Sequence, residues 1–185
     1  QFPYEEAIRV PFVIYAPGIN GGRVDRENLI LTIDIAPTIL ELAGIEKPQD
    51  VKFDGTSIVP VLKNPDTRLR DEFWIEFIPQ DWLKEKGFYG IRTSQFKLIE
   101  YLTGDREFYD LKEDPFELKN QHDNPIYKDT IAKLDVKVGA LKREVQQFFA
   151  EEEAKAGVIS GYYASLKTLV RKFISYFHEE GDDDE

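Results

Sequence analysis

An uninterrupted apolar run fills residues 10–16 (VPFVIYA) and ends at the turn residues Pro17 and Gly18. Runs of this length that are rich in Val, Ile, Phe and Tyr are typical of strands buried on both faces of a sheet. Such a strand needs neighbouring strands at its edges and helices above and below it, and the rest of the chain does not supply them all. We therefore predict that the sequence begins inside a larger α/β domain. A segment 10–16 that lay exposed, or was covered entirely by later elements of the same chain, would contradict this interpretation.

The next periodic segment predicts a helix that begins near Asp34 and ends at Gly44. Asp34 is suited to the N-cap, a role that explains it without a metal, and Pro37 is tolerated because it falls in the first turn. Gly44 can adopt the left-handed conformation of a helix C-cap. Three apolar residues recur at helical spacing and predict one buried face: Ile35, Ile39 and Leu42.

The character of the sequence changes near residues 64–67, after a short segment at 57–62 that is either helical or extended. Beyond this point, four runs rich in strand-forming residues predict short strands: residues 73–78, 88–93, 96–101 and 107–111. Tight connections, such as Ser94-Gln95, favour an antiparallel sheet over βαβ units. The predicted organisation has three parts: the end of an α/β domain (1–65), a small antiparallel β subdomain (66–125), and C-terminal helices with an acidic tail (126–185).

The C-terminal part is predicted to be helical, with Pro125 near the helix start. Apolar residues at steps of three and four form one stripe, which we expect to pack on the antiparallel sheet: Ile131, Leu134, Val138, Leu141, Val145 and Phe148. A second amphipathic segment, residues 158–178, is predicted to pack on a partner helix or on itself. A membrane surface is disfavoured, because anionic lipid repels the acidic tail beside it. That tail, residues 179–185, is predicted to be disordered.

Composition narrows the class of protein. Hydrophobic residues make up 42% of the sequence and charged residues 32%, as in globular rather than disordered proteins. The net charge of −11 argues against nucleic-acid binding, because the phosphate backbone repels an acidic surface. The sequence contains no cysteine, which excludes disulfides, thiolate metal sites and a cysteine nucleophile but indicates no compartment. No run approaches the roughly 18 apolar residues of a membrane span.

Three stretches, in this order, resemble the C-terminal part of the sulfatases, in the alkaline-phosphatase superfamily. The first is YEEAIRVP at residues 4–11, with the apolar run that follows it. The second is IDIAPTILELAG at residues 33–44, which is similar to the family's D-x-APT-x-L-x-LAG helix. The third is similar to the family's small C-terminal sheet and consists of GIRT at 90–93, FKLI at 96–99, EFYDL at 107–111 and DPFEL at 114–118. Together they are specific to the family, though not to a substrate.

The resemblance implies a fold and a chemistry. The fold is the C-terminal end of an alkaline-phosphatase-like α/β catalytic domain, followed by a small antiparallel sheet with packed helices. The chemistry is hydrolysis of sulfate esters or sulfamates by a formylglycine made from the Cys or Ser of a C/S-x-P-x-R motif, with calcium stabilising charge. This sequence contains no such motif. The resemblance implies that most of the family's calcium ligands correspond to positions upstream of Gln1. It implies the same for the family's sulfate-contacting lysine.

The chain is therefore expected to hold no catalytic residue, metal ligand or cofactor of its own, with calcium and formylglycine in the intact enzyme. The expected partners are the N-terminal half of a sulfatase and a sulfated small molecule or glycan. Two alternatives stay open. The chain could be a non-catalytic interaction module that uses its C-terminal helices, or a fragment of a phosphoesterase relative that uses Thr or Ser and two zinc ions.

Two side chains are candidates for substrate binding at the rim of such a site. Arg92 precedes a hairpin turn, where its guanidinium could contact an anionic substrate, although a structural pair with Asp or Glu is the commoner role. Trp82 lies in the loop 79–87, where it could line a pocket rim or pack against the sheet.

Other titratable residues are assigned structural roles. Glu5 and Glu6 would point to opposite sides of an extended chain, so neither is expected to share acid–base chemistry with the other. One of them is predicted to pair with Arg9. The two histidines, His122 and His178, are predicted to be surface residues rather than metal ligands.

Overall fold

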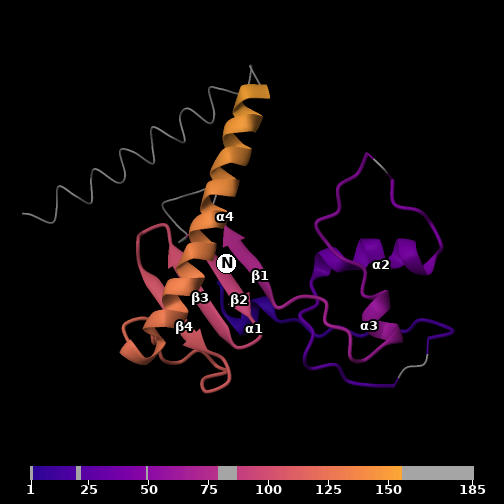
Figure 1. The fold of residues 1–185 in the computed structure, drawn as a ribbon, viewed down its shortest axis with the longest axis horizontal. Helices are drawn as coiled ribbons and strands as arrows, with labels where there is room; N and C mark the ends of the chain where they lie inside the picture. The colour runs from indigo at the N-terminus through magenta and orange to yellow at the C-terminus, as the bar shows by residue number, and fades with distance from the viewer. Residues whose placement is uncertain (1, 20–21, 49, 79–86, 156–185) are drawn as a thin grey trace, which may run out of the picture. The chain divides into compact units, whose positions relative to one another are not determined.

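The central feature of the computed structural model is a four-stranded antiparallel sheet in which the strand order follows the chain (Figure 1). The structure describes residues 2–19, 22–48, 50–78 and 87–155. The strands are β1 (Glu72–Phe77), β2 (Phe88–Thr93), β3 (Phe96–Tyr101) and β4 (Arg106–Asp110). All four predicted strands are confirmed, and the predicted bounds of β2 and β3 agree with the structure to the residue. The antiparallel pairing and the two-residue turn between β2 and β3 are confirmed as well.

One face of the sheet is covered by the beginning of α4 (Lys128–Lys155). Ile91, Leu98 and Phe108 lie side by side in the register of this face and are fully buried. The ring of Tyr127, in the 3-10 turn η2 (Pro125–Tyr127) before α4, contacts the ring of Phe108 with centroids 5.1 Å apart. The predicted packing of the helix on the sheet is therefore confirmed for the start of α4.

Ion pairs fasten α4 to both edges of the sheet. Asp135 pairs with Arg106 of β4, and Lys137 pairs with Glu72 of β1. Four residues of the predicted stripe are buried: Ile131, Leu134, Val138 and Leu141. The side chain of Phe148, the segment 158–178 and the tail 179–185 lie outside the described part of the chain.

The chain forms two compact units, residues 1–138 and residues 139–185, and the boundary between them falls within α4. The boundaries predicted near residues 65 and 125 stay a prediction. Within the described ranges, no helix is both long and apolar enough to cross a membrane.

The opposite face of the sheet carries an aromatic core and is contacted by the N-terminal segment. Buried side chains from three strands form this core: Phe88, Ile99, Tyr101 and Tyr109. Tyr4 packs against them just before α1 (Glu5–Ile8), a single helical turn. Residues 5 and 6 are therefore helical, and the prediction that they lie on an extended chain is wrong.

The sequence segment around α2 (Ile35–Leu42) also contains the 3-10 turn η1 (Thr32–Asp34) and α3 (Val59–Lys63). The helix predicted between Asp34 and Gly44 is confirmed. Gly44 has a φ of +66°, its N–H donates to Glu41 O at 3.1 Å, and Ile45 N donates to Leu40 O at 2.9 Å. This pair of bonds is the Schellman motif and confirms Gly44 as the stop signal.

Asp34 occupies the N-cap position of α2, but its side chain does not cap that helix. The carboxylate instead accepts a hydrogen bond from Leu31 N, at 2.8 Å, on the preceding turn. The capping role predicted for this side chain is therefore wrong. The carboxylate is committed to contacts outside α2, which are described below.

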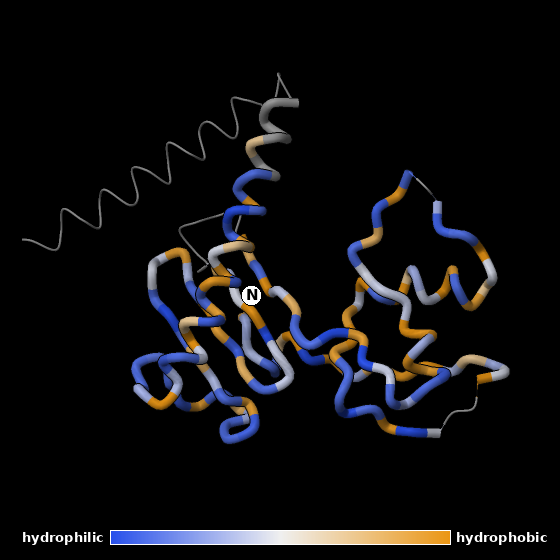
Figure 2. Tube along the Cα trace, in the orientation of Figure 1, coloured by the Kyte–Doolittle hydropathy of each residue, from blue (hydrophilic) through white to orange (hydrophobic). Residues whose placement is uncertain are grey.

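The buried strand predicted at residues 10–16 is absent. This segment is extended without strand pairing, and Val13 and Tyr15 are 92% and 89% exposed. The apolar face predicted to be buried on α2 is exposed too. Figure 2 shows both segments as predominantly apolar stretches of the trace. The physical reason is that the described residues include no strand to pair with 10–16, and that they cover this side of α2 only in part.

Candidate functional site

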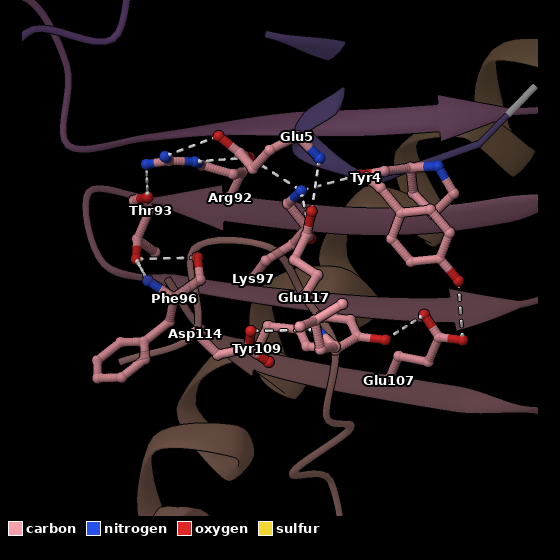
Figure 3. Close-up of polar contacts among 12 residues, drawn as sticks. Tyr4, Glu5, Arg92, Thr93, Phe96, Lys97, Glu107, Tyr109, Asp114 and Glu117 are labelled. Atoms are coloured by element: carbon pink, nitrogen blue, oxygen red, sulfur yellow. Dashed lines mark hydrogen bonds and ion pairs between the residues drawn. The ribbon is translucent and has the colours of Figure 1, made fainter. Parts of the chain in front are cut away.

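A buried lysine organises the contact between the N-terminal segment and the sheet (Figure 3). Lys97 of β3 is fully buried, and three oxygen atoms surround its ammonium group. Pro3 O accepts a hydrogen bond at 2.9 Å, and carboxylate oxygens of Glu5 and Glu117 lie at 2.9 and 2.6 Å. One hydrogen bond and two ion pairs thus compensate the buried ammonium group, as a buried charge requires.

Arg92 of β2 binds the same glutamate from the neighbouring strand. Its Nε and Nη2 donate to the two oxygens of Glu5 at 3.3 and 3.2 Å. Burial alone would raise the pKa of Glu5, but hydrogen bonds and charge from Arg92 and Lys97 outweigh it and hold that pKa below its ordinary value. Glu5 is therefore ionised at neutral pH.

Glu117 closes the arrangement from the loop after β4. Its second carboxylate oxygen accepts a hydrogen bond from Glu5 N at 2.5 Å, so it binds the main chain at the start of α1. Glu117 has a φ of +55°, which is uncommon for a residue with a side chain. Asp114 supports this conformation, because its carboxylate accepts from Leu118 N at 3.1 Å and Lys119 N at 2.9 Å. We call Pro3, Glu5, Arg92, Lys97 and Glu117 the Lys97 network; its two cations and two carboxylates sum to zero net charge.

A tyrosine cluster adjoins the Lys97 network on the same face of the sheet. The hydroxyls of Tyr4, Tyr101 and Tyr109 donate to the carboxylate of Glu107 at 3.3, 3.2 and 3.1 Å. Burial, together with Glu107 and the phenol of Tyr4, raises the pKa of Tyr101 and of Tyr109 far above the ordinary value. These phenols stay protonated as donors, so the cluster fixes the ring of Tyr4 rather than supplying an acid or a base.

A second buried carboxylate lies near the start of α2. Arg70 donates to both oxygens of Asp34, each at 2.6 Å, and Thr56 N donates to one of them at 2.9 Å. Burial would raise the pKa of Asp34, but Arg70 and the backbone donors hold it below its ordinary value. The contacts of Asp34 identify a structural anchor between α2 and the segment that enters β1.

The residues predicted from the sequence are found in different environments. Arg92 lies within the Lys97 network and pairs with Glu5, as in the structural pair with Asp or Glu named above as the commoner role. Its role in substrate binding stays a prediction. Trp82 lies outside the described residues. The prediction that Glu5 or Glu6 pairs with Arg9 is wrong: Glu5 binds two cations from the sheet, and the described residues show no ion pair between Glu6 and Arg9. His122 is partly exposed, with Nδ1 3.1 Å from the carboxylate of Asp123.

Sequence reasoning missed the central residue of this network. Residues 97, 99 and 101 share one face of β3, so an alternating pattern places Lys97 in line with Ile99 and Tyr101. A lysine on a core-facing row is a signal for a buried ion pair. Its partner Glu117 is 20 residues away, and nothing local in the sequence connects them. Within the described ranges no group of three or more His, Cys, Asp or Glu residues could hold a metal ion.

An exposed apolar surface is the other candidate for function. Phe12 and Ile14 line a shallow hollow together with Ile35, Ile39 and Leu42 of α2. Exposure alternates along residues 12–15: Phe12 and Ile14 are turned toward α2, and the two residues that follow them in turn, 13 and 15, point outward. We call this surface the 10–16/α2 face. It has the alternation of a strand but no neighbouring strand within the described residues.

Comparison with known proteins defines the class of protein. Residues 1–144 match the family model described as N-sulphoglucosamine sulphohydrolase, C-terminal. The chain is 35% identical over 137 residues to an N-acetylglucosamine-6-O-sulfatase of Bacteroides thetaiotaomicron, a match that covers 65% of this chain and 22% of that protein. It is 32% identical over 166 residues to an arylsulfatase of Volvox carteri, covering 75% of this chain and 25% of that protein.

A solved structure agrees with these sequence matches. It is described as a complex with its substrate D-glucosamine-2-N,6-O-disulfate, and it superposes with a TM-score of 0.52 at 31% identity. The superposition covers 62% of this chain and 24% of that one. The fold and these matches define the class as the C-terminal region of sulfatases in the alkaline-phosphatase superfamily.

Within that class, the chain belongs to the family whose model is described as the C-terminal part of N-sulphoglucosamine sulphohydrolase. It spans about a quarter of the length of the curated relatives named here. The sequence resemblance to sulfatases is confirmed. Residues 10–16 are exposed, the result stated above to contradict an origin inside a larger α/β domain, yet the family match shows that this exposure does not contradict membership of the sulfatases.

Proposed function

We propose that the chain is the C-terminal portion of an enzyme that hydrolyses sulfate esters or sulfamates of a small molecule or glycan. The match of residues 1–144 to the sulfatase family carries this proposal. The named relatives act on sulfated substrates, among them N-acetylglucosamine-6-O-sulfate groups and D-glucosamine-2-N,6-O-disulfate. A sulfated hexosamine is therefore the first substrate class to test.

The chain's own residues point to a supporting role in that reaction. The sequence has no cysteine and no serine before x-Pro-x-Arg, so the formylglycine expected in the intact enzyme would come from another part of the polypeptide. The residues described also do not fit a calcium centre, because they include no group of three acidic or imidazole side chains around a common point. No catalytic step is therefore assigned to a residue of this chain.

The 10–16/α2 face supports the same role. It exposes Val13 and Tyr15 almost completely, and an exposed apolar surface that combines an unpaired extended segment with a helix is a favourable surface for protein contact. In the proposed enzyme, the rest of the α/β domain covers this face and adds neighbouring strands to residues 10–16.

The test compares two proteins: the product of the complete reading frame that encodes the chain, and the 185-residue chain alone. Both are assayed for hydrolysis of an aryl sulfate and of N- and 6-O-sulfated glucosamine, with the matching aryl phosphate and phosphonate ester as controls. We expect the complete product to release sulfate and the isolated chain to release none.

Three results would contradict the proposal. Sulfate release by the isolated chain would place catalysis within it. Phosphate or phosphonate hydrolysis without sulfate hydrolysis would favour the phosphoesterase alternative. An isolated chain that is monomeric, melts cooperatively and comes from a reading frame without a C/S-x-P-x-R motif would favour the interaction module.

A further inference from the structure

The Lys97 network binds main-chain atoms of the N-terminal segment as well as its side chains. Lys97 donates to the carbonyl oxygen of Pro3, and Glu117 accepts from the N–H of Glu5. Contacts with side chains tolerate small shifts of the backbone, whereas contacts with a carbonyl and an N–H fix the position of the backbone itself. The network therefore sets where residues 3–5 lie on the sheet.

Stability alone does not account for this arrangement. Replacing a buried ion pair completely by apolar side chains is often neutral or stabilising, because the desolvation of two charges offsets their attraction. The surrounding face is already aromatic and aliphatic, so a methionine at position 97 would suit its chemistry. What an apolar side chain cannot supply is a directed bond to Pro3 O and an ion pair with both glutamates.

The fixed segment connects directly to the surface that meets the rest of the proposed enzyme. α1 is one turn long and separates Tyr4 from residues 10–16 of the 10–16/α2 face. Glu5 is held from β2 by Arg92, from β3 by Lys97 and from the loop after β4 by Glu117. These contacts therefore fix the backbone at the start of α1 relative to the sheet.

We propose that Lys97 is a positioning residue for sulfate hydrolysis, which fixes the backbone of residues 3–5 and so the placement of the catalytic part that joins them. This inference rests on the proposed function. In this proposal Lys97 acts through Pro3, Glu5 and Glu117 rather than by touching the substrate. A displacement of about 1 Å at a reacting centre can lower the rate roughly 100-fold, so a positioning residue affects kcat more than KM.

The experiment uses the complete enzyme and three variants. Lys97→Met removes the ammonium and keeps the length of the side chain. Lys97→Arg keeps the charge and a donor for Pro3 O. Lys137→Met is the matched control, because Lys137 also pairs with a glutamate, Glu72, but fastens α4 rather than the N-terminal segment. For each protein, kcat and KM are measured well below the melting temperature and normalised to the folded fraction, and hydrogen–deuterium exchange is followed in the peptide 3–9.

We expect Lys97→Met to lower kcat by about 10- to 100-fold with a smaller change in KM. Exchange in the peptide 3–9 should accelerate, because the N–H of Glu5 loses its ordered acceptor. Lys97→Arg should recover part of kcat, and Lys137→Met should leave both kcat and this peptide unchanged. Should Lys97→Met fail to fold, Glu117→Gln, which keeps the shape and removes the charge, is expected to show the same effects more weakly.

The outcomes separate this inference from the function on which it rests. A wild-type enzyme that releases no sulfate from any substrate tested refutes the proposed function. A wild-type enzyme that is active, with folded Lys97→Met or Glu117→Gln of full kcat, overturns the positioning role and leaves the proposed function intact.

Discussion

The carboxylate of Asp34 and the guanidinium of Arg70 are joined by two hydrogen bonds of 2.6 Å between residues 36 positions apart. The side chain of Asp34 is 1% exposed and that of Arg70 is 15% exposed. This geometry is the bidentate pairing for which the planar guanidinium is suited, and it occurs where water hardly reaches the carboxylate. The pair fastens the start of α2 to the segment that leads into β1.

Removing Arg70 should therefore be costly. Arg70→Ala leaves the buried carboxylate of Asp34 without its cation, and we expect the free energy of unfolding to fall by about 3–5 kcal/mol. Arg68→Ala is the matched control, because its pair with Glu27 is well exposed and should contribute less than about 1 kcal/mol. Urea unfolding of both variants measures the difference, and equal losses would show that Asp34 does not depend on its partner.

The pH dependence of stability should carry a contribution from Glu5. Its pKa in the folded protein lies below the ordinary value of 4.5. The stability it contributes is therefore fully present above about pH 4.5, is lost as the pH falls toward the lowered folded-state pKa, and is absent below it. Glu5→Gln should flatten this part of the profile of melting temperature against pH. Glu6→Gln, at the exposed neighbouring position, should leave its shape unchanged; a similar flattening in both variants would assign the effect elsewhere.

Gly55 should not accept a side chain. A Cβ atom at this position would lie 2.0 Å from the backbone oxygen of Ile33, which cannot move without displacing η1. We expect Gly55→Ala to destabilise the protein by about 1–3 kcal/mol or more. Gly139→Ala is the contrasting variant, because a Cβ there meets only Arg143 at 3.5 Å and alanine suits a helix interior. Thermal melting should show a gain of about 0.5–1 kcal/mol for that variant, and a loss there as large as that of Gly55→Ala would contradict the steric explanation.

A charge on the 10–16/α2 face should reveal whether that face is covered. Val13 and Val136 are both strongly exposed here, at 92% and 71%. If the proposed enzyme buries Val13, Val13→Asp in the complete product should abolish soluble, active protein, because an unpaired carboxylate would enter an apolar core. Val136→Asp, on the surface of α4, should have little effect. Soluble yield and sulfate release measure both, and a fully active Val13→Asp enzyme would show that the face stays open.

The sequence predicted the sheet well because its strands depend on local patterns. The strands at 88–93 and 96–101 are separated by a two-residue turn, and their strand-forming residues together with this turn suffice to place them. The partners of Glu5 could not be predicted in the same way. A local rule favoured Arg9, four positions away, whereas Arg92 and Lys97 reach Glu5 only after the sheet has formed.

The failed prediction for residues 10–16 has a different cause. An apolar run indicates that a segment is suited to burial between other elements. The described residues include no strand that pairs with residues 10–16. The partner of Lys97 was difficult to predict for another reason. Lys97 is the one polar residue on the face of β3 that also carries Ile99 and Tyr101, and nothing in the sequence indicates Glu117 as its partner.

The sequence separations within the Lys97 network bear on the order in which the protein folds. Each strand of the sheet pairs with its neighbour along the chain, so its hairpins close short loops and can form early. The bond between Glu5 and Glu117 spans 112 residues, and closing so long a loop has a larger entropic penalty than any hairpin turn. The docking of residues 3–5 is therefore expected to be among the last steps of folding. Protection of the Glu5 amide from hydrogen exchange would then indicate that folding is complete.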